Sequence, residues 1–427
     1  MRYQSITNQL FAINRQKLAS LMPAKSLAIV LSNDEMPRNG DQCYPYRQNS
    51  DMFYLTGIEQ EKTVLFLFPS HPVESQREIL FILKPDEHLE TWLGRKLRKE
   101  EATKLSGIKT VKYLDDFELM LKDMLLAANV LLLNQNEYPK FFNPNESADL
   151  RFARRIKQDF PAMPLDRLAP LLWKIRLCKE PQELELLTKA CDITNQAFHR
   201  VLGKLRPGMF EYEVEALITY EFVRNGATHA YSPIVASGLN ACSLHYTLNS
   251  DPCHEGDLLL MDFGAEYANY AADCTRTIPI NGRFNRRQRQ VYEAVLRIQR
   301  HALSLLVPGN TINKVNKETN LLAQEEMIKL SLFTKNDVKR QNPDNPLYFK
   351  YMMHGVNHYT GLDVHDVGGK DEPFVPGMVL TFEPAIYIRE ERLGIRLENN
   401  IVIGYPSFDL MASIPLEPEE IEDLMCR

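Results

Sequence analysis

Short apolar runs alternate with helical patterns along the first 170 residues of the chain. The runs are rich in Leu, Ile, Val and Phe and have the length of buried strands. They lie at 26–32, 63–69, 78–84 and 129–134. The stretches 7–22 and 115–127 have a helical pattern. This part of the sequence therefore predicts an α/β domain, and no glycine-rich phosphate-binding loop follows any of its strands.

The pattern changes near 160–182, where prolines are followed by a long helical stretch. Pro181 fits the first turn of that helix, because the N–H that proline lacks has no partner there. A chain of 427 residues also favours two domains over one. We expect a boundary close to residue 172, with domains at 1–172 and 173–427.

The second part contains a weak internal repeat. RPGMFEYEV at 206–214 is echoed by VPGNTINKV at 307–315, an offset of 101 residues, with proline, glycine and valine in register. Each copy opens a predicted helix, at 210–225 and 311–332, and each is later followed by a possible hairpin with two acids. A duplicated helix-plus-hairpin unit would bring two similar β faces together around one cleft.

The first acidic hairpin lies in MDFGAEYANYAADCTRT at 261–277. Asp262 and Asp273 are predicted to be cross-strand partners, with the turn centred between Tyr267 and Ala268. Directly opposed residues share a face of the sheet, so both carboxylates would point the same way, with Cβ atoms about 5 Å apart.

The second hairpin runs through TFEPAIYIREERLGIRLENN at 381–400. Glu383 and Glu398 are symmetric about the polar turn REER, and Pro384 predicts an irregular strand because it cannot donate to a ladder. Alternation places one set of side chains on a common face. That set is Thr381, Glu383, Ala385, Tyr387, Arg396 and Glu398.

Four acids on strands that look buried need compensation, because like charges at short range and burial both disfavour carboxylates. Two divalent cations would balance them, and an imidazole could complete the site. The segment HGVNHYTGLDVHD at 354–366 supplies His354, His358 and His365 in a loop or irregular strand, and their spacing alone does not select a ligand. Any one of these residues could be a cap or a solvated surface group, but the whole set favours a metal site.

The composition of the chain argues against several classes of protein, including nucleic-acid-binding and membrane proteins. Hydrophobic residues make up 44% of the chain and charged residues 25%, with 50 basic against 56 acidic side chains and a net charge of −6. These values are typical of a soluble globular protein, and the mild acidity argues against nucleic acid as a partner. No run of about 20 apolar residues predicts a membrane span, and the N-terminal sequence lacks the apolar core of a secretion signal.

The cysteines indicate a reducing compartment. All seven are scattered, without a C-x-x-C pair, which is typical of reduced thiols in the cytoplasm. Cys274, beside Asp273, is interpreted as a small buried hydrophobic residue. We therefore expect a cytoplasmic protein without a membrane or nucleic-acid partner.

The acids and the histidine loop resemble the site of the pita-bread metallopeptidases, a family that includes methionine aminopeptidase, prolidase and aminopeptidase P. Creatinase shares that fold without the metals. The family's ordered ligands, Asp, Asp, His, Glu and Glu, fall on Asp262, Asp273, His358, Glu383 and Glu398. The pattern HG-x-x-H-x-x-G-x-x-x-HD selects His358 among the histidines.

The resemblance is closest to bacterial aminopeptidase P and covers nearly the whole chain. YPYRQNSDMFYLTG at 44–57 and ETWLGRKL at 90–97 are similar to its N-terminal domain. SLHYT, DCTRTIPINGRF, HDVGG and GIRLE are similar to its catalytic domain. ENN at 398–400 departs from the family, which usually has a further acid after the glutamate. The fold implied is an α/β N-terminal domain followed by an α+β pita-bread domain with a pseudo-two-fold repeat.

The resemblance also implies an activity, which is hydrolysis of the bond between an N-terminal residue and a following proline by a metal-bridged hydroxide. Asp273 and Glu398 would bridge two metals, with Asp262 on one and His358 and Glu383 on the other. Oxygen donors with one imidazole favour Mn²⁺, with Zn²⁺, Co²⁺ or Fe²⁺ as alternatives.

Further residues take roles by the same resemblance. Glu383 would be the general base, and His354 would donate to the carbonyl oxygen. His245 and His365 would line the substrate pocket, while Arg396 and Tyr387 would orient Glu383 and Glu398.

Three questions stay open on the sequence: the exact activity, the oligomeric state and the place of Trp92. The enzyme could be a prolidase restricted to Xaa-Pro dipeptides, or a pita-bread domain without metals that binds peptides or proteins. Relatives are commonly dimers or tetramers, so we expect a homodimer or homotetramer. Trp92 could belong to the substrate pocket of a neighbouring subunit or to a domain core.

Overall fold

The structure is a computed structural model that describes residues 2–138 and 145–426. Its contacts form two units, one comprising Gln4–Arg176 and the other mainly Leu177–Arg427. The division falls at the end of helix α7 (Ala169–Arg176). Each unit is described by itself below.

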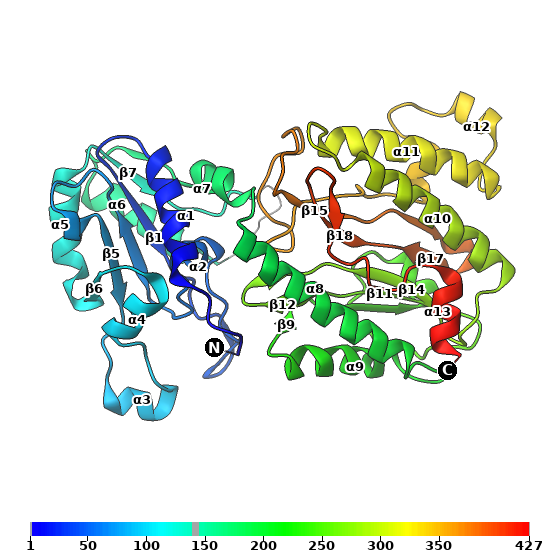
Figure 1. The fold of residues 1–427 in the computed structure, drawn as a ribbon, viewed down its shortest axis with the longest axis horizontal. Helices are drawn as coiled ribbons and strands as arrows, with labels where there is room; N and C mark the ends of the chain where they lie inside the picture. Colours follow the sequence, from blue (N-terminus) through cyan, green and yellow to red (C-terminus); the bar gives the residue numbers. More distant parts are fainter. Residues whose placement is uncertain (1, 139–144, 427) are drawn as a thin grey trace. The chain divides into compact units, whose positions relative to one another are not determined.

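A six-stranded sheet in the order β6-β5-β4-β1-β7-β8 forms the centre of the first unit (Figure 1). β1 is antiparallel to β4 and parallel to β7, so the sheet is mixed. Its strands are β1 (Ser26–Leu31), β4 (Val64–Leu67), β5 (Glu78–Ile82), β6 (Thr110–Tyr113), β7 (Val130–Leu133) and β8 (Leu165–Arg167). The four predicted apolar runs correspond to β1, β4, β5 and β7, and are confirmed.

Helices cover this sheet and close its core. The predicted helices at 7–22 and 115–127 are confirmed as α1 (Asn8–Leu21) and α5 (Phe117–Ala127). Leu27, Phe66 and Phe81 of the sheet are buried in one cluster with Phe117 of α5. The remaining elements are β2 (Pro37–Asn39), β3 (Gln42–Cys43), α2 (Ser50–Thr56), α3 (Glu87–Leu93), α4 (Lys99–Ser106) and α6 (Ala148–Asp159).

Helix α3 exposes its apolar side chains. Trp92 is 77% exposed, and Leu89 and Leu93 are 53% and 68% exposed. The prediction that Trp92 could belong to a domain core is therefore wrong, because its ring is largely in solvent.

Two pairs of helices frame the second unit. α8 (Pro181–Leu202) packs against α9 (Glu211–Arg224), and α10 (Arg286–Leu305) packs against α11 (Ile312–Lys329). The two Pro-Gly sequences of the predicted repeat lie in the turns between the paired helices, where Gly208 and Gly309 both have φ of 89°. That positive φ explains why glycine recurs in both copies. Two shorter helices follow, α12 (Lys335–Arg340) and α13 (Pro418–Met425).

Local sequence explains where these helices begin. Pro181 is the first residue of α8, as predicted, and Glu183 accepts a bond from the Glu180 backbone N–H at 2.8 Å. Asn285 and Gln288 form a reciprocal capping box at the start of α10, with both bonds 2.9 Å long. Such caps satisfy N–H groups that have no partner within the helix.

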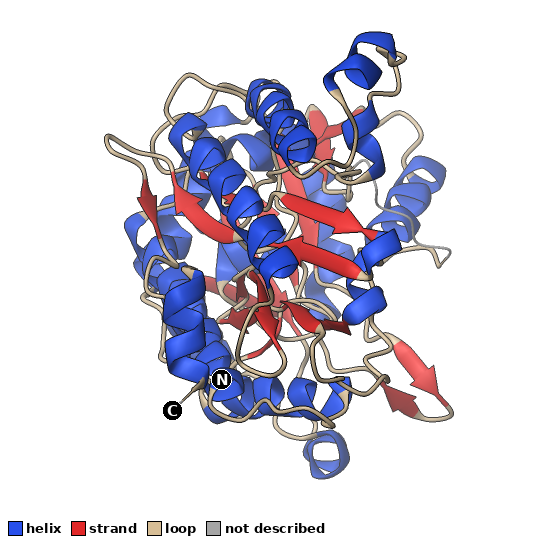
Figure 2. Ribbon diagram, turned by 90° about the vertical axis from the view of Figure 1, so that its right-hand side faces the viewer, coloured by secondary structure: helices blue, strands red, loops and turns tan. Residues whose placement is uncertain are grey.

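The strands of the second unit lie between these helices (Figures 1 and 2). One sheet has the order β10-β11-β14, a second β13-β12-β9 and a third β15-β18-β19, and β16 pairs with β17. The strands are β9 (Thr228–His229), β10 (Ile234–Ser237), β11 (Leu258–Asp262), β12 (Ala265–Tyr267), β13 (Tyr270–Ala271), β14 (Thr275–Pro279), β15 (Val379–Phe382), β16 (Ala385–Ile388), β17 (Leu393–Arg396), β18 (Asn399–Val402) and β19 (Phe408–Asp409).

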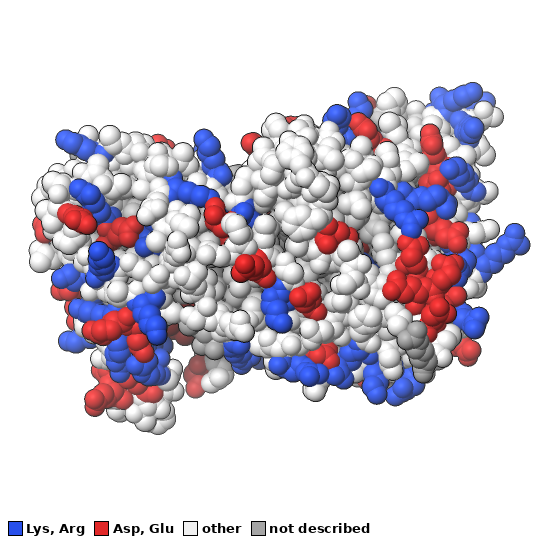
Figure 3. All heavy atoms as spheres, in the orientation of Figure 1, with Lys and Arg blue, Asp and Glu red and all other residues white. Residues whose placement is uncertain are grey.

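Surface properties add two observations. Within residues 2–138 and 145–426, no helix is both long and apolar enough to cross a membrane. Acidic and basic side chains are interspersed over the face drawn in Figure 3, so that face carries both signs of charge.

Candidate metal centre

The first acidic hairpin has a register different from the predicted one. Asp262 pairs with Thr275, and Tyr267 pairs with Tyr270 at the far end. The prediction that Asp262 and Asp273 are direct cross-strand partners is therefore wrong by two residues. Because side chains alternate with a period of two, this shift leaves both acids on the same face of the hairpin.

The turn of this hairpin explains the shift. Its two central residues are Ala268 and Asn269, with φ of 51° and 67°. Positive φ at both positions is the conformation of a tight two-residue turn, which fixes the register of the strands that it joins. The predicted turn centre, between Tyr267 and Ala268, lies one residue too early, and one residue in the turn changes the pairing by two.

Tyr231 joins the two acids of the first hairpin. Its hydroxyl oxygen lies 2.6 Å from Asp262 Oδ1 and 2.6 Å from Asp273 Oδ1. The hydroxyl has one proton, so it donates to one carboxylate at a time. The sequence analysis missed Tyr231, which lies shortly before β10, and only the pairing of Ile234 with Asp262 in the β10–β11 ladder places it beside the acids.

The second hairpin has the predicted register. Phe382 pairs with Asn399 and Ala385 pairs with Arg396, so Glu383 and Glu398 lie opposite each other between these two pairs. The ladder is interrupted there and divides into β15–β18 and β16–β17. The irregularity predicted from Pro384 is confirmed.

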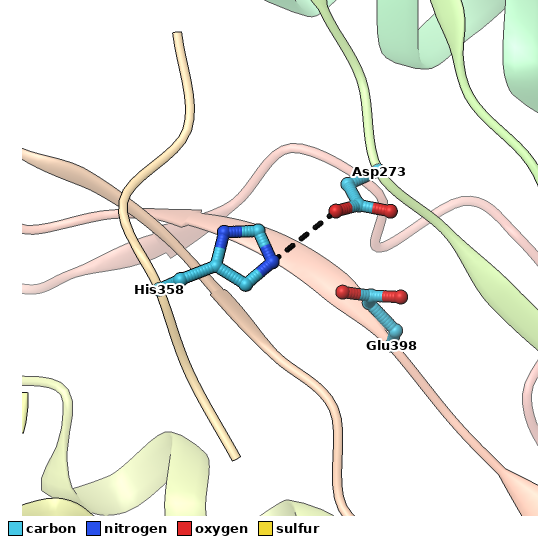
Figure 4. A group of neighbouring side chains, drawn as sticks. All are labelled: Asp273, His358 and Glu398. Atoms are coloured by element: carbon cyan, nitrogen blue, oxygen red, sulfur yellow. Dashed lines mark ion pairs between the residues drawn. The ribbon is translucent and has the colours of Figure 1, made fainter. Parts of the chain in front are cut away.

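His358 completes a cluster with one acid from each hairpin. The ligand atoms of Asp273, His358 and Glu398 all lie within 4.8 Å of one another, and in Figure 4 the three side chains point toward a common centre. His358 Nε2 is 3.3 Å from Asp273 Oδ2 and 3.8 Å from Glu383 Oε1. The segment 354–366 contains no regular strand or helix, as predicted.

The orientation of the His358 ring is fixed by its other nitrogen. His358 Nδ1 lies 3.0 Å from the carbonyl oxygen of Tyr359. A carbonyl oxygen only accepts, so Nδ1 carries a proton and Nε2 faces the carboxylates. This is the tautomer that a metal-binding imidazole requires.

Arg396 links the two hairpins. Its guanidinium donates to Asp262 Oδ2 at 2.6 Å, to the Tyr387 hydroxyl at 2.7 Å and to Thr275 Oγ1 at 3.0 Å. Thr275 in turn donates to Glu398 Oε2 at 2.7 Å. Arg396 was predicted beside Glu383 and Glu398, and its hydrogen bonds reach Glu398 through Thr275 and also bind Asp262 of the other hairpin.

The structure places the three other predicted histidines around this cluster. His354 Nε2 is 3.0 Å from the Tyr387 hydroxyl, and its Nδ1 is 2.8 Å from the carbonyl oxygen of its neighbour Gly355. The ring of His365 packs edge-on against His358, with centroids 4.5 Å apart. His245 lies in an exposed loop after a short turn of helix (Gly238–Cys242).

Burial and mutual repulsion govern the acids of the cluster. Burial raises the pKa of Asp262, raises the pKa of Glu383 to about 7 and raises the pKa of Glu398 well above its ordinary value, and neighbouring carboxylates add to each shift. Burial opposes a charged His358, but Asp273 and Glu383 outweigh it and raise its pKa to about 9. Burial and the Arg396 charge lower the pKa of His354 to about 4.

These shifts indicate a site that needs positive charge. Without a cation, the cluster favours protons on its carboxylates and on His358. A metal ion would take the place of those protons, because its ligands bind in their deprotonated form. Carboxylate oxygens with one imidazole suit divalent cations, and Cys274 is buried with a thiol whose pKa burial raises to about 12, so it adds no thiolate. The residues present therefore fit divalent metal ions.

Comparison with known proteins agrees with this geometry. The model of metallopeptidase family M24 matches residues 185–404, and that of the aminopeptidase P N-terminal domain matches residues 11–132. The fold and the cluster define a metallopeptidase with the pita-bread fold, and the chain belongs to metallopeptidase family M24.

Individual relatives are more specific. The chain is 38% identical to the Xaa-Pro aminopeptidase of Escherichia coli, over 98% of each protein. Its structure matches that of a putative aminopeptidase P from Bacillus anthracis, with a TM-score of 0.92 and 32% identity over 99% of each chain. It also matches Zn-substituted E. coli aminopeptidase P in complex with product, with a TM-score of 0.90 and 35% identity over 99% of each chain. The resemblance to aminopeptidase P is therefore confirmed.

Proposed function

We propose that this enzyme releases the N-terminal residue of peptides whose second residue is proline, by hydrolysing the bond between the two. The observation that carries the proposal is the convergence of Asp273, His358 and Glu398 on one centre, in a chain that is 38% identical to the Xaa-Pro aminopeptidase of Escherichia coli over 98% of each protein. The activity belongs to a metal-dependent hydrolase, and the residues below are the ones that we assign to it.

Five side chains would hold two divalent metal ions. Asp273 and Glu398 would contact both ions, Asp262 would contact one, and His358 and Glu383 the other. The oxygen-rich donor set favours Mn²⁺ over Zn²⁺, Co²⁺ or Fe²⁺. When bound, the ions supply Lewis acidity, which polarises the scissile carbonyl and makes a nucleophile available near neutral pH.

Glu383 is the general base in this proposal. Its side chain is 21% exposed, so water can reach the carboxylate, as a proton acceptor requires. It lies at the break in the second hairpin, within 3.8 Å of both His354 and His358. The carboxylate would take the proton of the attacking water and pass it toward the leaving nitrogen.

The hydrogen bonds of His354 limit how it can act. Arg396 donates to the Tyr387 hydroxyl, so that hydroxyl donates to His354 Nε2, while Nδ1 donates to Gly355. The imidazole is therefore neutral, with both nitrogens occupied. To donate to a substrate carbonyl, His354 must release the Gly355 carbonyl oxygen, so that its Nδ1–H is free, or gain a proton at Nε2 in place of its Tyr387 contact.

His245 and His365 are assigned to substrate binding. Both are exposed, and both act near the cluster, His365 through its ring contact with His358 and His245 through its weak electrostatic effect on His354. An exposed imidazole beside a buried cluster is suited to contacting a peptide as it enters.

The assembly and the location of the protein complete the proposal. The exposed Trp92, Leu89 and Leu93 on α3 support a homodimer or homotetramer in which α3 packs against a second copy of the chain. The free cysteines are consistent with the cytoplasm, which cell fractionation would test. We place the domain boundary near residue 172.

Hydrolysis of a short peptide panel tests this function. With Mn²⁺ added, the enzyme should cleave both Xaa-Pro dipeptides and Xaa-Pro-Yaa tripeptides at the Xaa-Pro bond, and chelator should abolish cleavage. An enzyme that cleaves the dipeptides and leaves the tripeptides intact would be a prolidase. Absence of cleavage at any Xaa-Pro bond would refute the proposal.

A further inference from the structure

Two buried residues face each other across the β15–β18 ladder beneath the cluster. Thr381 pairs with Asn400, and neither side chain is accessible to solvent. Neither residue carries an ionisable group or a metal-ligand role in the proposal above. Each reaches out of the ladder to the backbone of one residue of the cluster.

Asn400 binds both backbone groups of Asp273. Its Nδ2 donates to the Asp273 carbonyl oxygen at 3.0 Å, and its Oδ1 accepts from the Asp273 N–H at 3.1 Å. Asp273 lies between β13 and β14, outside any strand. The carboxamide therefore provides the pair of bonds that a neighbouring strand would otherwise provide. The Cys191 thiol lies 3.7 Å from the same Oδ1 and helps to hold the amide in place.

Thr381 likewise binds both backbone groups of His358. Its N–H donates to the His358 carbonyl oxygen at 2.8 Å, and its Oγ1 accepts from the His358 N–H at 3.3 Å. His358 also lies outside any strand. The two cross-strand partners thus hold the backbones of an acid and a histidine that are 85 positions apart in the sequence, at 273 and 358.

We infer that Thr381 and Asn400 are positioning residues that set the spacing between His358 and Asp273 for metal binding. Their shared ladder makes that spacing a property of one rigid pair, with His358 Nε2 and Asp273 Oδ2 held 3.3 Å apart. Such precision matters because binding constellations tolerate errors of only about 0.5 Å. The inference rests on the proposed function, since it takes both residues to be metal ligands.

The neighbouring Asn399 provides a matched control. It is 2% exposed, but its side chain makes a different set of contacts. Asn399 Oδ1 accepts from Arg276 Nη2 at 2.7 Å, and its Nδ2 donates to Asp409 Oδ2 at 2.6 Å. These bonds hold a buried arginine and the C-terminal region rather than the backbone of Asp273 or His358. Truncating Asn399 should therefore cost stability without moving the backbone of Asp273 or His358, the two ligands that the inference concerns.

Calorimetric titration of Mn²⁺ into the metal-free, full-length protein tests the inference without using activity. Asn400→Ala and Thr381→Val should each weaken Mn²⁺ binding by about 10- to 100-fold, the range found when groups that orient metal ligands are removed. Thr381→Ser keeps the hydroxyl and should bind within about threefold of the wild type. Asn399→Ala should lower the melting temperature and leave the affinity unchanged.

Three outcomes would overturn the inference. Wild-type affinity in both Asn400→Ala and Thr381→Val would show that the hydrogen bonds of these two side chains do not position the ligands. An equal loss of affinity in Asn399→Ala would show a general effect of destabilisation. Absence of Mn²⁺ binding by the wild type would refute the inference together with the proposed metal site, whereas tight wild-type binding with unchanged variants would refute the inference alone. Circular dichroism identifies folded variants, and if Asn400→Ala does not fold, the comparison of Thr381→Val with Thr381→Ser decides the question.

Discussion

The two acidic hairpins deliver similar carboxylates to one centre, but different contacts hold them. In the second hairpin, Glu383 and Glu398 face each other in the register that its own turn sets. In the first, Asp262 and Asp273 are offset by two residues and are joined by the hydroxyl of Tyr231. The first hairpin therefore depends on residues from other segments, whereas the second is defined mainly by its own sequence.

This difference suggests that the two hairpins have different roles in the site. The first hairpin is fixed by Tyr231, by Arg396 and by the amide of Asn400, which suits ligands whose positions must not change. Glu383 of the second hairpin lies beside Pro384 at a break in the ladder, and its side chain is 21% exposed. A carboxylate that accepts and releases a proton needs such access to water and substrate.

The largest expected effect distinguishes the general base from a residue that only binds metal. Glu383→Gln should lower kcat by about 10²- to 10⁴-fold, the usual contribution of a general base, because the amide cannot accept a proton. Asp262→Asn, the matched change in the first hairpin, should weaken metal binding about as much as Glu383→Gln does, since each residue would contact one ion, but it should lower kcat less because Asp262 is the partner of Arg396 and not the base. Steady-state kinetics and metal analysis of both variants check this prediction. Near-normal turnover in Glu383→Gln would contradict the assignment of the base.

A smaller effect concerns Glu183, which accepts a hydrogen bond from the first hairpin, and the pH dependence of folding stability that it causes. The Tyr270 hydroxyl donates to Glu183 Oε1 at 3.0 Å, and burial raises the pKa of Glu183 to about 7 from its ordinary 4.5. Between those two pH values the folded protein keeps a proton that the unfolded chain has lost, so stability falls as pH rises through this window. The loss amounts to about 3 kcal/mol, at about 1.4 kcal/mol for each pH unit.

Glu183→Gln removes that loss, because glutamine does not ionise. The difference in free energy of unfolding between the variant and the wild type should therefore be larger, in favour of the variant, at pH 8 than at pH 4. Denaturant unfolding at both pH values measures the gain, and Glu185→Gln, which changes an exposed glutamate on the same helix, serves as the control. A constant difference between variant and wild type would contradict the prediction.

Removing one tyrosine hydroxyl beside each hairpin, that of Tyr231 or that of Tyr387, gives a further comparison of the two hairpins. Tyr231→Phe removes the hydroxyl that joins Asp262 and Asp273, and should weaken metal binding about tenfold. Tyr387→Phe removes a hydroxyl that contacts Arg396 and His354, and should lower kcat while metal affinity stays within about threefold. Calorimetry and kinetics on both variants give the comparison. If the two variants lose metal affinity equally, the assignment of different roles to the two hairpins is wrong.

The smallest effect concerns the turn of the first hairpin. Ala268 has φ of 51°, a conformation that is strained for alanine and free for glycine. Ala268→Gly should raise stability by up to about 1 kcal/mol. Ala271→Gly, in the adjacent strand, should lower it, because glycine there adds flexibility without relieving strain. Thermal unfolding distinguishes the two, and a loss of stability in both variants would show that the turn is not strained.

The same comparison shows what the sequence could predict. The polar REER turn and Pro384 are local signals, and they gave the second hairpin its correct register. The first hairpin turns at Ala268–Asn269, which lacks the glycine that usually marks such turns, so the predicted centre rested on the assumed pairing of Asp262 with Asp273. The apolar runs located the strands of the N-terminal unit because those strands are buried.

Other features of the site have no local signal. Tyr231, Thr275 and Asn400 become neighbours of the acids only through the order of strands in the sheets. The likeness to the family supplied His358 among three histidines, which spacing alone did not. Long-range pairing is therefore where the sequence was least informative.

Metal content tests the central claim, that the two hairpins and His358 together hold two divalent ions. Elemental analysis of the protein after loading with Mn²⁺ and dialysis should give about two ions per chain for the wild type. Asp273→Ala should retain fewer than one, because Asp273 would contact both. A wild type that retains no metal, or an Asp273→Ala variant that retains two ions, would contradict the account.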